Sequence, residues 1–153
     1  MKKITALILS IAFVFLALTS CGTVIAEKGD VTVVIEAADG EYEVYKTYLE
    51  NVENKNNGAL GVLENLRDRE ENPLHVVYSN STYGAFITEI GSIKQDESEG
   101  KYVVAYTSVE SDSYASAPTQ IYEGTTLFSS GVGISSMTVN EGTVILFRIV
   151  EYS

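Results

Sequence analysis

The sequence contains no tryptophan, one cysteine, one histidine and two prolines among its 153 residues. Because Cys21 has no second cysteine to pair with, an intramolecular disulfide bond and a zinc site made of several thiolates are excluded. A Ser-His-Asp triad would have to use His75, and no serine nucleophile motif is present. No glycine-rich phosphate-binding loop occurs either. The sequence therefore predicts a protein that is not an enzyme, with no catalytic residues, no metal site and no cofactor.

Acidic residues outnumber basic ones by 21 to 10, which gives a formal net charge of −11. An anionic protein is repelled by phosphates and by acidic lipid headgroups, so we expect neither nucleic acid as a partner nor electrostatic binding to a membrane surface. The acids could supply a carboxylate pair for glycoside hydrolysis, although no pair stands out. The segment DESE at 96–99 lacks the spacing and the glycine of a dedicated calcium loop, and we expect a solvated loop there.

The N-terminus has the features of a secretory signal. Lys2 and Lys3 precede an apolar run at 4–18, which is shorter than the roughly 20 residues needed to span a bilayer as a helix. The motif LTSC, which ends at Cys21, resembles the bacterial lipobox, in which the cysteine thiol receives diacylglycerol. Two acyl chains hold a protein stably at a membrane. This pattern predicts lipidation at Cys21.

An alternative cleavage site is the sequence VIA at 24–26, which resembles an ordinary signal-peptidase site and would release a soluble protein starting at Glu27. We favour the lipobox because its cysteine directly follows the apolar run. The expected organisation is a signal peptide at 1–20, a lipidated tether at 21–29 and one domain at 30–153. The protein would then be lipid-anchored on the outer face of the cell membrane, at the bacterial cell surface.

Hydrophobic periodicity predicts strands around one helix. The β-branched stretch 31–37 reads as a strand, and 41–52 continues extended after a turn at Asp39 and Gly40. Apolar residues at 59, 62, 63 and 66 have helical spacing, with Asn57 as a cap and Asn72 followed by Pro73 as the stop.

The second half of the sequence is richer in strand patterns. Strands are expected at 74–79, 84–90 and 100–109, and a terminal hairpin is expected from 135–139 and 143–152. In the strand at 84–90, alternation places Ala85 and Ile87 on one face and Phe86, Thr88 and Ile90 on the other. The run 144–147 is apolar on both faces, which is typical of an inner strand. These elements predict an α+β fold, with a mixed sheet packed on one main helix.

Ten tyrosines are the most distinctive aromatic feature of the sequence. Tyrosine offers a flat apolar ring with one hydrogen-bonding group, which suits it to ligand binding, although it is also common in half-buried strands. Tyr102 and Tyr106 are four residues apart in one predicted strand and therefore share a face. We take Tyr102 and Tyr106, together with Tyr83, as the candidate ligand-binding residues.

Four stretches carry a resemblance that covers nearly the whole predicted domain: GALGVLENL at 58–66, YGAFITEIGSI at 83–93, GKYVVAY at 100–106 and SSGVGISSMTVNEGTVILFRIVEY at 129–152. In order and spacing they resemble the C-terminal domain of transcobalamin and intrinsic factor, which has relatives of unknown function among bacterial secreted proteins. Tyr102 stands where that family usually has a tryptophan. The resemblance implies a β-grasp-like fold, and in the animal carriers this domain closes over one face of cobalamin.

Two functions follow as hypotheses. The first is a non-catalytic binding module for a corrinoid or another large planar small molecule, acting with a membrane or carrier protein. A half-site of this kind is expected to bind weakly alone, because only one face of the ligand is buried. The second is a protein or glycan interaction module of the cell envelope, which would use a sheet edge and tyrosine-rich loops.

Overall fold

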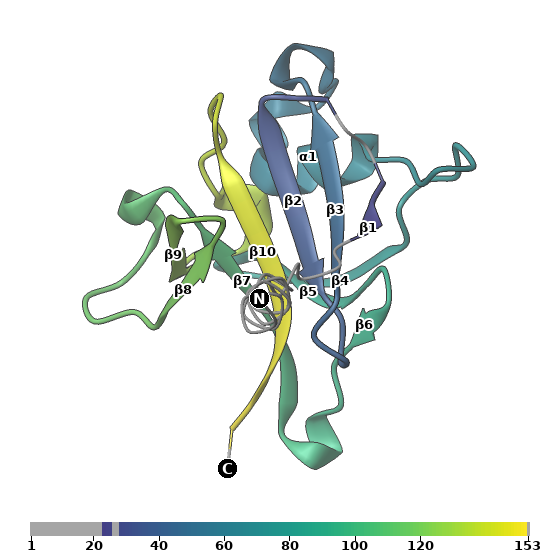
Figure 1. Ribbon diagram of the computed structural model, residues 1–153. Coiled ribbons are helices and arrows are strands. Elements are labelled where there is room, and N and C mark those ends of the chain that lie inside the picture. Colours follow the sequence, from purple (N-terminus) through teal and green to yellow (C-terminus); the bar gives the residue numbers. More distant parts are fainter. Residues whose placement is uncertain (1–22, 26–27, 153) are drawn as a thin grey trace, which may run out of the picture.

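The structure is a computed structural model that describes residues 23–25 and 28–152 of the chain (Figure 1). The expected signal peptide and the lipidation of Cys21 lie outside the described residues. None of the helices in the described ranges is both long enough and apolar enough to cross a membrane.

A mixed sheet of seven strands, in the order β1-β3-β2-β10-β7-β9-β8, forms the centre of the molecule. β10 pairs in parallel with β2 and antiparallel with β7. The side chains of Ile145, Leu146 and Phe147 in β10 are almost fully buried, so both faces of this strand are covered, and the predicted inner strand is confirmed. The strands are β1 (Thr23–Val24), β2 (Val31–Glu36), β3 (Tyr42–Thr47), β7 (Lys101–Thr107), β8 (Thr119–Tyr122), β9 (Thr125–Ser129) and β10 (Val144–Glu151).

One face of this sheet is covered jointly by a helix and by a second, smaller sheet (Figure 1). The helix is α1 (Gly58–Asn65), and the small sheet consists of β4 (Val76–Ser81), β5 (Gly84–Ile90) and β6 (Ile93–Lys94). Leu63 of α1 and Ile87 of β5 belong to the same buried cluster as Phe147. The described chain is therefore mostly β, with one short helix against a curled mixed sheet. Short 3-10 turns connect the elements: η1 (Leu49–Asn51), η2 (Lys55–Asn57), η3 (Glu97–Glu99), η4 (Glu110–Asp112) and η5 (Ile134–Ser136).

The opposite face of the sheet has its own apolar cluster, which the β8-β9 hairpin helps to cover. Tyr122 of β8 and Leu127 of β9 pack with Leu146 of β10. Tyr122 also meets the ring of Tyr42 edge to face, with the ring centroids 5.5 Å apart. Burial raises the pKa of the Tyr122 hydroxyl. The sequence analysis did not predict this hairpin.

The helix ends earlier than its apolar spacing predicted. α1 stops at Asn65, and Leu66 is already extended. The Asp68 carboxylate accepts hydrogen bonds from the backbone N–H groups of Glu70 and Asn72, at 2.8 and 2.9 Å, and so stabilises a turn before Pro73. Asn57 directly precedes α1 but makes no side-chain capping hydrogen bond. The expected stop at Asn72 was therefore wrong, because a local turn competes with the helix.

The predicted terminal hairpin is also wrong. No strand forms at 135–139, where the 3-10 turn η5 ends at Ser136, and β10 pairs with β2 and β7 instead. The Gly142 N–H donates to the Asp30 carbonyl at 2.6 Å, and the Thr32 N–H donates to the Thr143 carbonyl at 2.9 Å. These bonds join the start of β10 to β2 in parallel. Because β2 and β7 occupy the two edges of β10, the segment 135–139 cannot pair with it.

Candidate functional site

The three predicted tyrosines do not form one surface. Tyr106 is 3% exposed and belongs to the apolar cluster that contains Tyr122 and Leu127. Burial raises the pKa of its hydroxyl. Tyr106 therefore has almost no surface with which to contact a ligand, and its assignment as a binding residue is corrected to a core residue.

Tyr102 and Tyr83 are accessible but lie on different elements. Tyr102 is 37% exposed near the start of β7, where its ring meets the Tyr152 ring at a centroid distance of 5.9 Å. Tyr83 is 73% exposed in the turn between β4 and β5. Its carbonyl accepts a hydrogen bond from the Gly133 N–H at 2.9 Å, which ties this turn to the loop before η5. Each tyrosine could contact a ligand separately.

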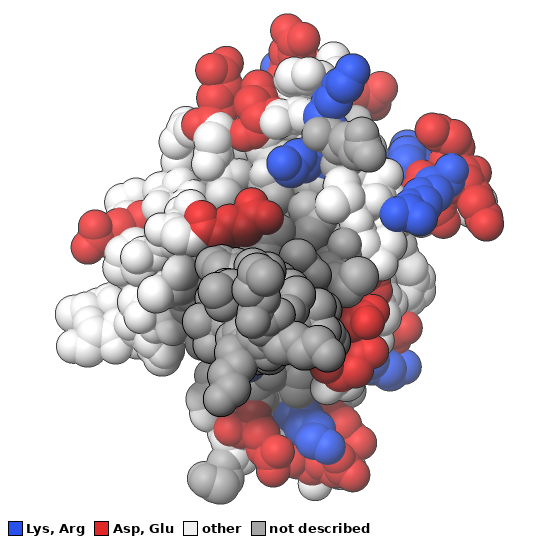
Figure 2. Space-filling model, in the orientation of Figure 1, with Lys and Arg blue, Asp and Glu red and all other residues white. Residues whose placement is uncertain are grey.

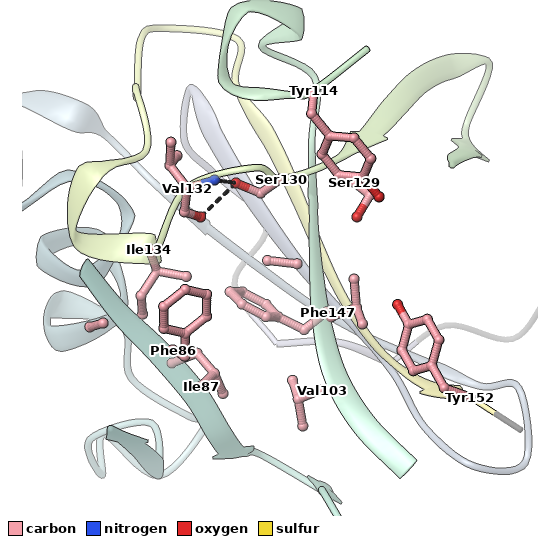
Figure 3. A pocket seen from close by; sticks show the side chains of 14 residues that line it. Phe86, Ile87, Val103, Tyr114, Ser129, Ser130, Val132, Ile134, Phe147 and Tyr152 are labelled. Atoms are coloured by element: carbon pink, nitrogen blue, oxygen red, sulfur yellow. Dashed lines mark hydrogen bonds between the residues drawn. The ribbon is translucent and has the colours of Figure 1, made fainter. Parts of the chain in front are cut away.

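The structure places a cleft of about 250 Å³ between β5 and β7 (Figure 3). Ala85 and Ile87 of β5 form one wall, Val103 and Ala105 of β7 form the other, and Phe147 of β10 also lines it. All five residues are apolar. The cleft therefore opens into the side of the main hydrophobic core.

The cleft exists because two neighbouring strands belong to different sheets. β5 pairs with β4 and β6, whereas β7 pairs with β10 and β9. No strand ladder joins β5 to β7 within the described residues. Side chains alone fill the space between these strands, and they leave part of it open.

Three aromatic side chains surround this cleft, and each is roughly half exposed: Phe86, Tyr114 and Tyr152. In the view of Figure 3, Tyr114 and Tyr152 lie toward opposite ends of the cleft, and Phe86 lies on its β5 side. Aromatic rings supply large contact areas and prefer offset or edge-to-face packing on other rings. An apolar or planar group could therefore be held between them.

Sequence reasoning missed all three of these aromatic residues. Alternation did predict that Phe86 faces away from Ala85 and Ile87, and this is confirmed by its exposure. The proximity of Phe86 to β7 depends on how the two sheets pack, which no local pattern reveals. Tyr114 is in the loop after η4 and Tyr152 follows β10, so these two residues have no shared spacing in the sequence.

Among the residues that the structure describes, no charged side chain lines the cleft. Ser130 is polar, but its hydroxyl donates to the Val132 carbonyl at 2.8 Å and accepts from the Val132 N–H at 3.2 Å. These two bonds satisfy the hydroxyl within its own loop. The cleft therefore offers apolar and aromatic contact, without a pair of titratable groups for acid-base chemistry.

The other residues considered in the sequence make local contacts. The His75 Nε2 atom is 3.0 Å from Glu89 Oε1, and Lys94 Nζ is 2.9 Å from Glu89 Oε2. The hydrogen bond from Lys94, assisted by that from His75, lowers the pKa of the Glu89 carboxyl. In the acidic loop, Asp96 accepts hydrogen bonds from the backbone N–H groups of Ser98 and Glu99. Within the described ranges, no group of three or more His, Cys, Asp and Glu side chains could hold a metal ion.

Comparison with known proteins shows a similarity in fold to a solved structure. No family model matches the sequence, and no curated protein matches it. A solved structure that is similar is the crystal structure of a "putative metal binding protein" from Ruminococcus gnavus ATCC 29149, with a TM-score of 0.55 and 17% sequence identity. The similarity covers 82% of this chain and 100% of that chain. At this identity, the comparison shows that the two proteins share a fold.

Proposed function

We propose that the protein is a bacterial surface lipoprotein, anchored through Cys21, whose domain is a non-catalytic binding module. The observation that carries the proposal is the apolar cleft between β5 and β7, surrounded by Phe86, Tyr114 and Tyr152. Exposed aromatic side chains around a concave apolar surface are typical of ligand sites. The lining itself carries no charge, which favours uncharged or planar groups inside the cleft over phosphates and metal ions.

The first candidate ligand is a corrinoid or another large planar molecule. The mixed sheet with a helix on one face supports the β-grasp-like, transcobalamin-like assignment made from the sequence. Ligand pockets usually measure about 300–1,000 Å³, so a cleft of about 250 Å³ would enclose only part of such a molecule. A membrane or carrier protein would cover the remainder, and binding to this chain alone would be weak.

A thermal-shift screen of the full chain in detergent tests this proposal, with cobalamin, haem and a set of oligosaccharides as probes. A ligand at 100 times its dissociation constant stabilises the folded state by about 2.7 kcal/mol. Phe86→Ala should abolish most of the shift. Ile121→Ala is the matched control, because Ile121 is an exposed apolar side chain on β8 that does not line the cleft. A shift that survives Phe86→Ala would place the ligand elsewhere and contradict the proposal.

The second candidate is a protein or glycan interaction module of the cell envelope. One observation favours the protein form of this function. On the side of the cleft, the edge of β7 carries backbone N–H and C=O groups for which the described residues provide no hydrogen-bond partner.

A further inference from the structure

The peptide groups of β7 point alternately to its two neighbours, and this alternation can be assigned. The Gly100 carbonyl accepts from the Tyr152 N–H at 3.0 Å, and the Ser108 N–H donates to the Val144 carbonyl at 2.9 Å. The backbone N–H and C=O groups of the even-numbered residues in this strand therefore point toward β10. Odd-numbered residues, from Lys101 to Thr107, direct theirs to the opposite edge.

Most groups on that opposite edge are already paired. Lys101 exchanges two backbone hydrogen bonds with Asp96, at 2.9 and 2.8 Å. Thr107 pairs with Phe128 of β9, and the Ala105 carbonyl accepts from the Ser130 N–H at 2.9 Å. The Val103 N–H, the Val103 carbonyl and the Ala105 N–H remain, and no described group bonds them. We call these three groups the β7 window.

The β7 window lies in the cleft, since Val103 and Ala105 both line it. The facing strand does not satisfy the window, because β5 and β7 form no ladder. On β5, the Ala85 N–H donates to the Ser135 hydroxyl at 3.0 Å. Unpaired strand edges are templates for added strands, and natural proteins usually protect them.

The arrangement of the β7 window matches an extended peptide. In an antiparallel pair, one residue of the added chain exchanges both of its hydrogen bonds with the residue opposite. A residue opposite Val103 would do so, and a carbonyl two residues along would accept from the Ala105 N–H. A segment of three residues therefore satisfies the window, and an apolar side chain of that segment could enter the cleft beside Phe147.

Charge decides which peptide is favoured. The segments that border the cleft carry Glu110, Asp112 and Glu151, whereas Glu99 and Lys101 form an ion pair and together add no net charge. In Figure 2, acidic side chains occur in several places on the face shown, and basic ones lie next to acidic ones. The whole chain has a net charge of −11, so a second copy would be repelled. A basic segment is attracted.

We propose that the cleft binds an extended, positively charged segment of a partner protein, whose main chain pairs with the β7 window. The proposal rests on the binding role of the cleft given above and names the class of ligand. Pairing through the main chain supplies affinity, and the aromatic residues around the cleft select the side chains that enter it.

Proline substitution tests the main-chain pairing directly. Val103→Pro removes an N–H for which the described residues offer no hydrogen-bond partner, at a strand edge where proline is tolerated. Val103→Ala is the matched control, because it shortens the same side chain and keeps the N–H. The probe is the blocked hexapeptide Lys-Val-Lys-Val-Lys-Val, compared with Glu-Val-Glu-Val-Glu-Val. Binding to the full chain in detergent is measured by calorimetry, and the Val103 and Ala105 amide signals are followed by NMR.

We expect the lysine peptide to shift both amide signals and to lose about 10-fold in affinity with Val103→Pro, which corresponds to about 1.4 kcal/mol. Val103→Ala should lose less affinity than Val103→Pro, because it shortens a side chain that lines the cleft but keeps the N–H. Equal binding to Val103→Pro and Val103→Ala, unmoved amide signals, or equal binding of the glutamate peptide would overturn the inference. If planar compounds bind in a Phe86-dependent manner while the peptides do not, the peptide inference fails alone. If neither class binds, the proposed function fails with it.

Discussion

Replacing Gly133 by alanine is expected to destabilise the protein by about 1–3 kcal/mol, the usual cost of overpacking. Gly133 lies between η5 and the start of β5, with φ −66° and ψ 154°, which any residue can adopt. A Cβ atom at this position would lie 2.7 Å from the Tyr83 carbonyl oxygen and 2.8 Å from the Ala85 carbonyl oxygen. Both contacts are with backbone atoms, so no side-chain rotation can relieve them.

Gly131 provides a matched control two residues away in the same loop. A Cβ atom there would meet its nearest neighbours, including the Tyr114 ring, at 3.4 Å, an ordinary van der Waals distance. Gly→Ala at a compatible position stabilises by about 0.4–1 kcal/mol through the unfolded state. This gain is smaller than the expected clash at Gly133. Gly133→Ala should therefore be destabilising, and Gly131→Ala neutral or slightly stabilising.

Urea denaturation followed by circular dichroism measures both variants, and thermal unfolding gives a second reading. For a domain of this size, 1 kcal/mol corresponds to a shift of about 3–5 °C in Tm. If Gly133→Ala unfolds with the wild-type midpoint, or if Gly131→Ala is equally destabilised, the contact argument is refuted.

Three further predictions concern the core, the pH dependence and the anchor. Tyr106→Ala should lower the free energy of unfolding, measured by urea denaturation, by about 3–5 kcal/mol, as for other buried aromatic residues. Tyr83→Ala should change it by less than about 0.5 kcal/mol, because Tyr83 is exposed. Similar effects of the two substitutions would contradict this difference in burial. Burial raises the pKa of Tyr45 and Tyr106 above the ordinary 10.0, so their contribution to stability is complete below pH 10 and is lost as the pH rises through the raised values. The urea concentration at the unfolding midpoint should fall as the pH rises above about 10, and it should fall less steeply in Tyr45→Phe than in the wild type. If both proteins lose stability equally with pH, the buried Tyr45 hydroxyl is not the cause. Cys21→Ala should abolish fatty-acid labelling and membrane association, and a variant that remains labelled would exclude lipidation at this residue.

Continuous patterns in the sequence predicted the elements that depend on local spacing. The apolar run at 144–147 predicted an inner strand, and β10 has this role because its neighbours cover both edges and both faces. The β-branched run from Val31 likewise predicted β2. In the helix, Leu66 keeps the apolar spacing and is buried, but its backbone is extended. The apolar spacing therefore predicted the burial of Leu66 correctly, although this residue lies just beyond the end of the helix.

Local irregularities limited the rest of the prediction. Ile90 was expected to share a face with Phe86, yet it is buried with Ile87, because a β-bulge between Val77 and Tyr78 shifts the register and leaves Thr88 as an extra residue. The β8-β9 hairpin turns at Glu123 and Gly124, both with positive φ. Glutamate is unusual in such a turn, which favours Asn, Asp or Gly, so no typical turn motif marked this hairpin.

The candidate site was the hardest part to predict because it lies between two sheets. Alternation correctly placed Tyr102 and Tyr106 on one face of β7, but it could not reveal that Tyr122 and Leu127 pack in the same cluster as Tyr106. Phe86 and Val103 meet at the cleft through packing between β5 and β7, which share no ladder. Contacts of this kind depend on how the two sheets pack, and neither segment has a sequence pattern that predicts them.

The parallel pairing of β2 with β10 also sets when the domain can fold. β2 is among the first described strands to be synthesised, and β10 is the last, so the centre of the sheet stays open until nearly the whole domain has been made. Proteins dominated by such non-local pairings fold slowly, and their strand edges are exposed to aggregation in the meantime. Under the export that we propose for this chain, the delay would be an advantage, because a translocation channel accepts an unfolded polypeptide and the sheet would close only after β10 had emerged on the far side.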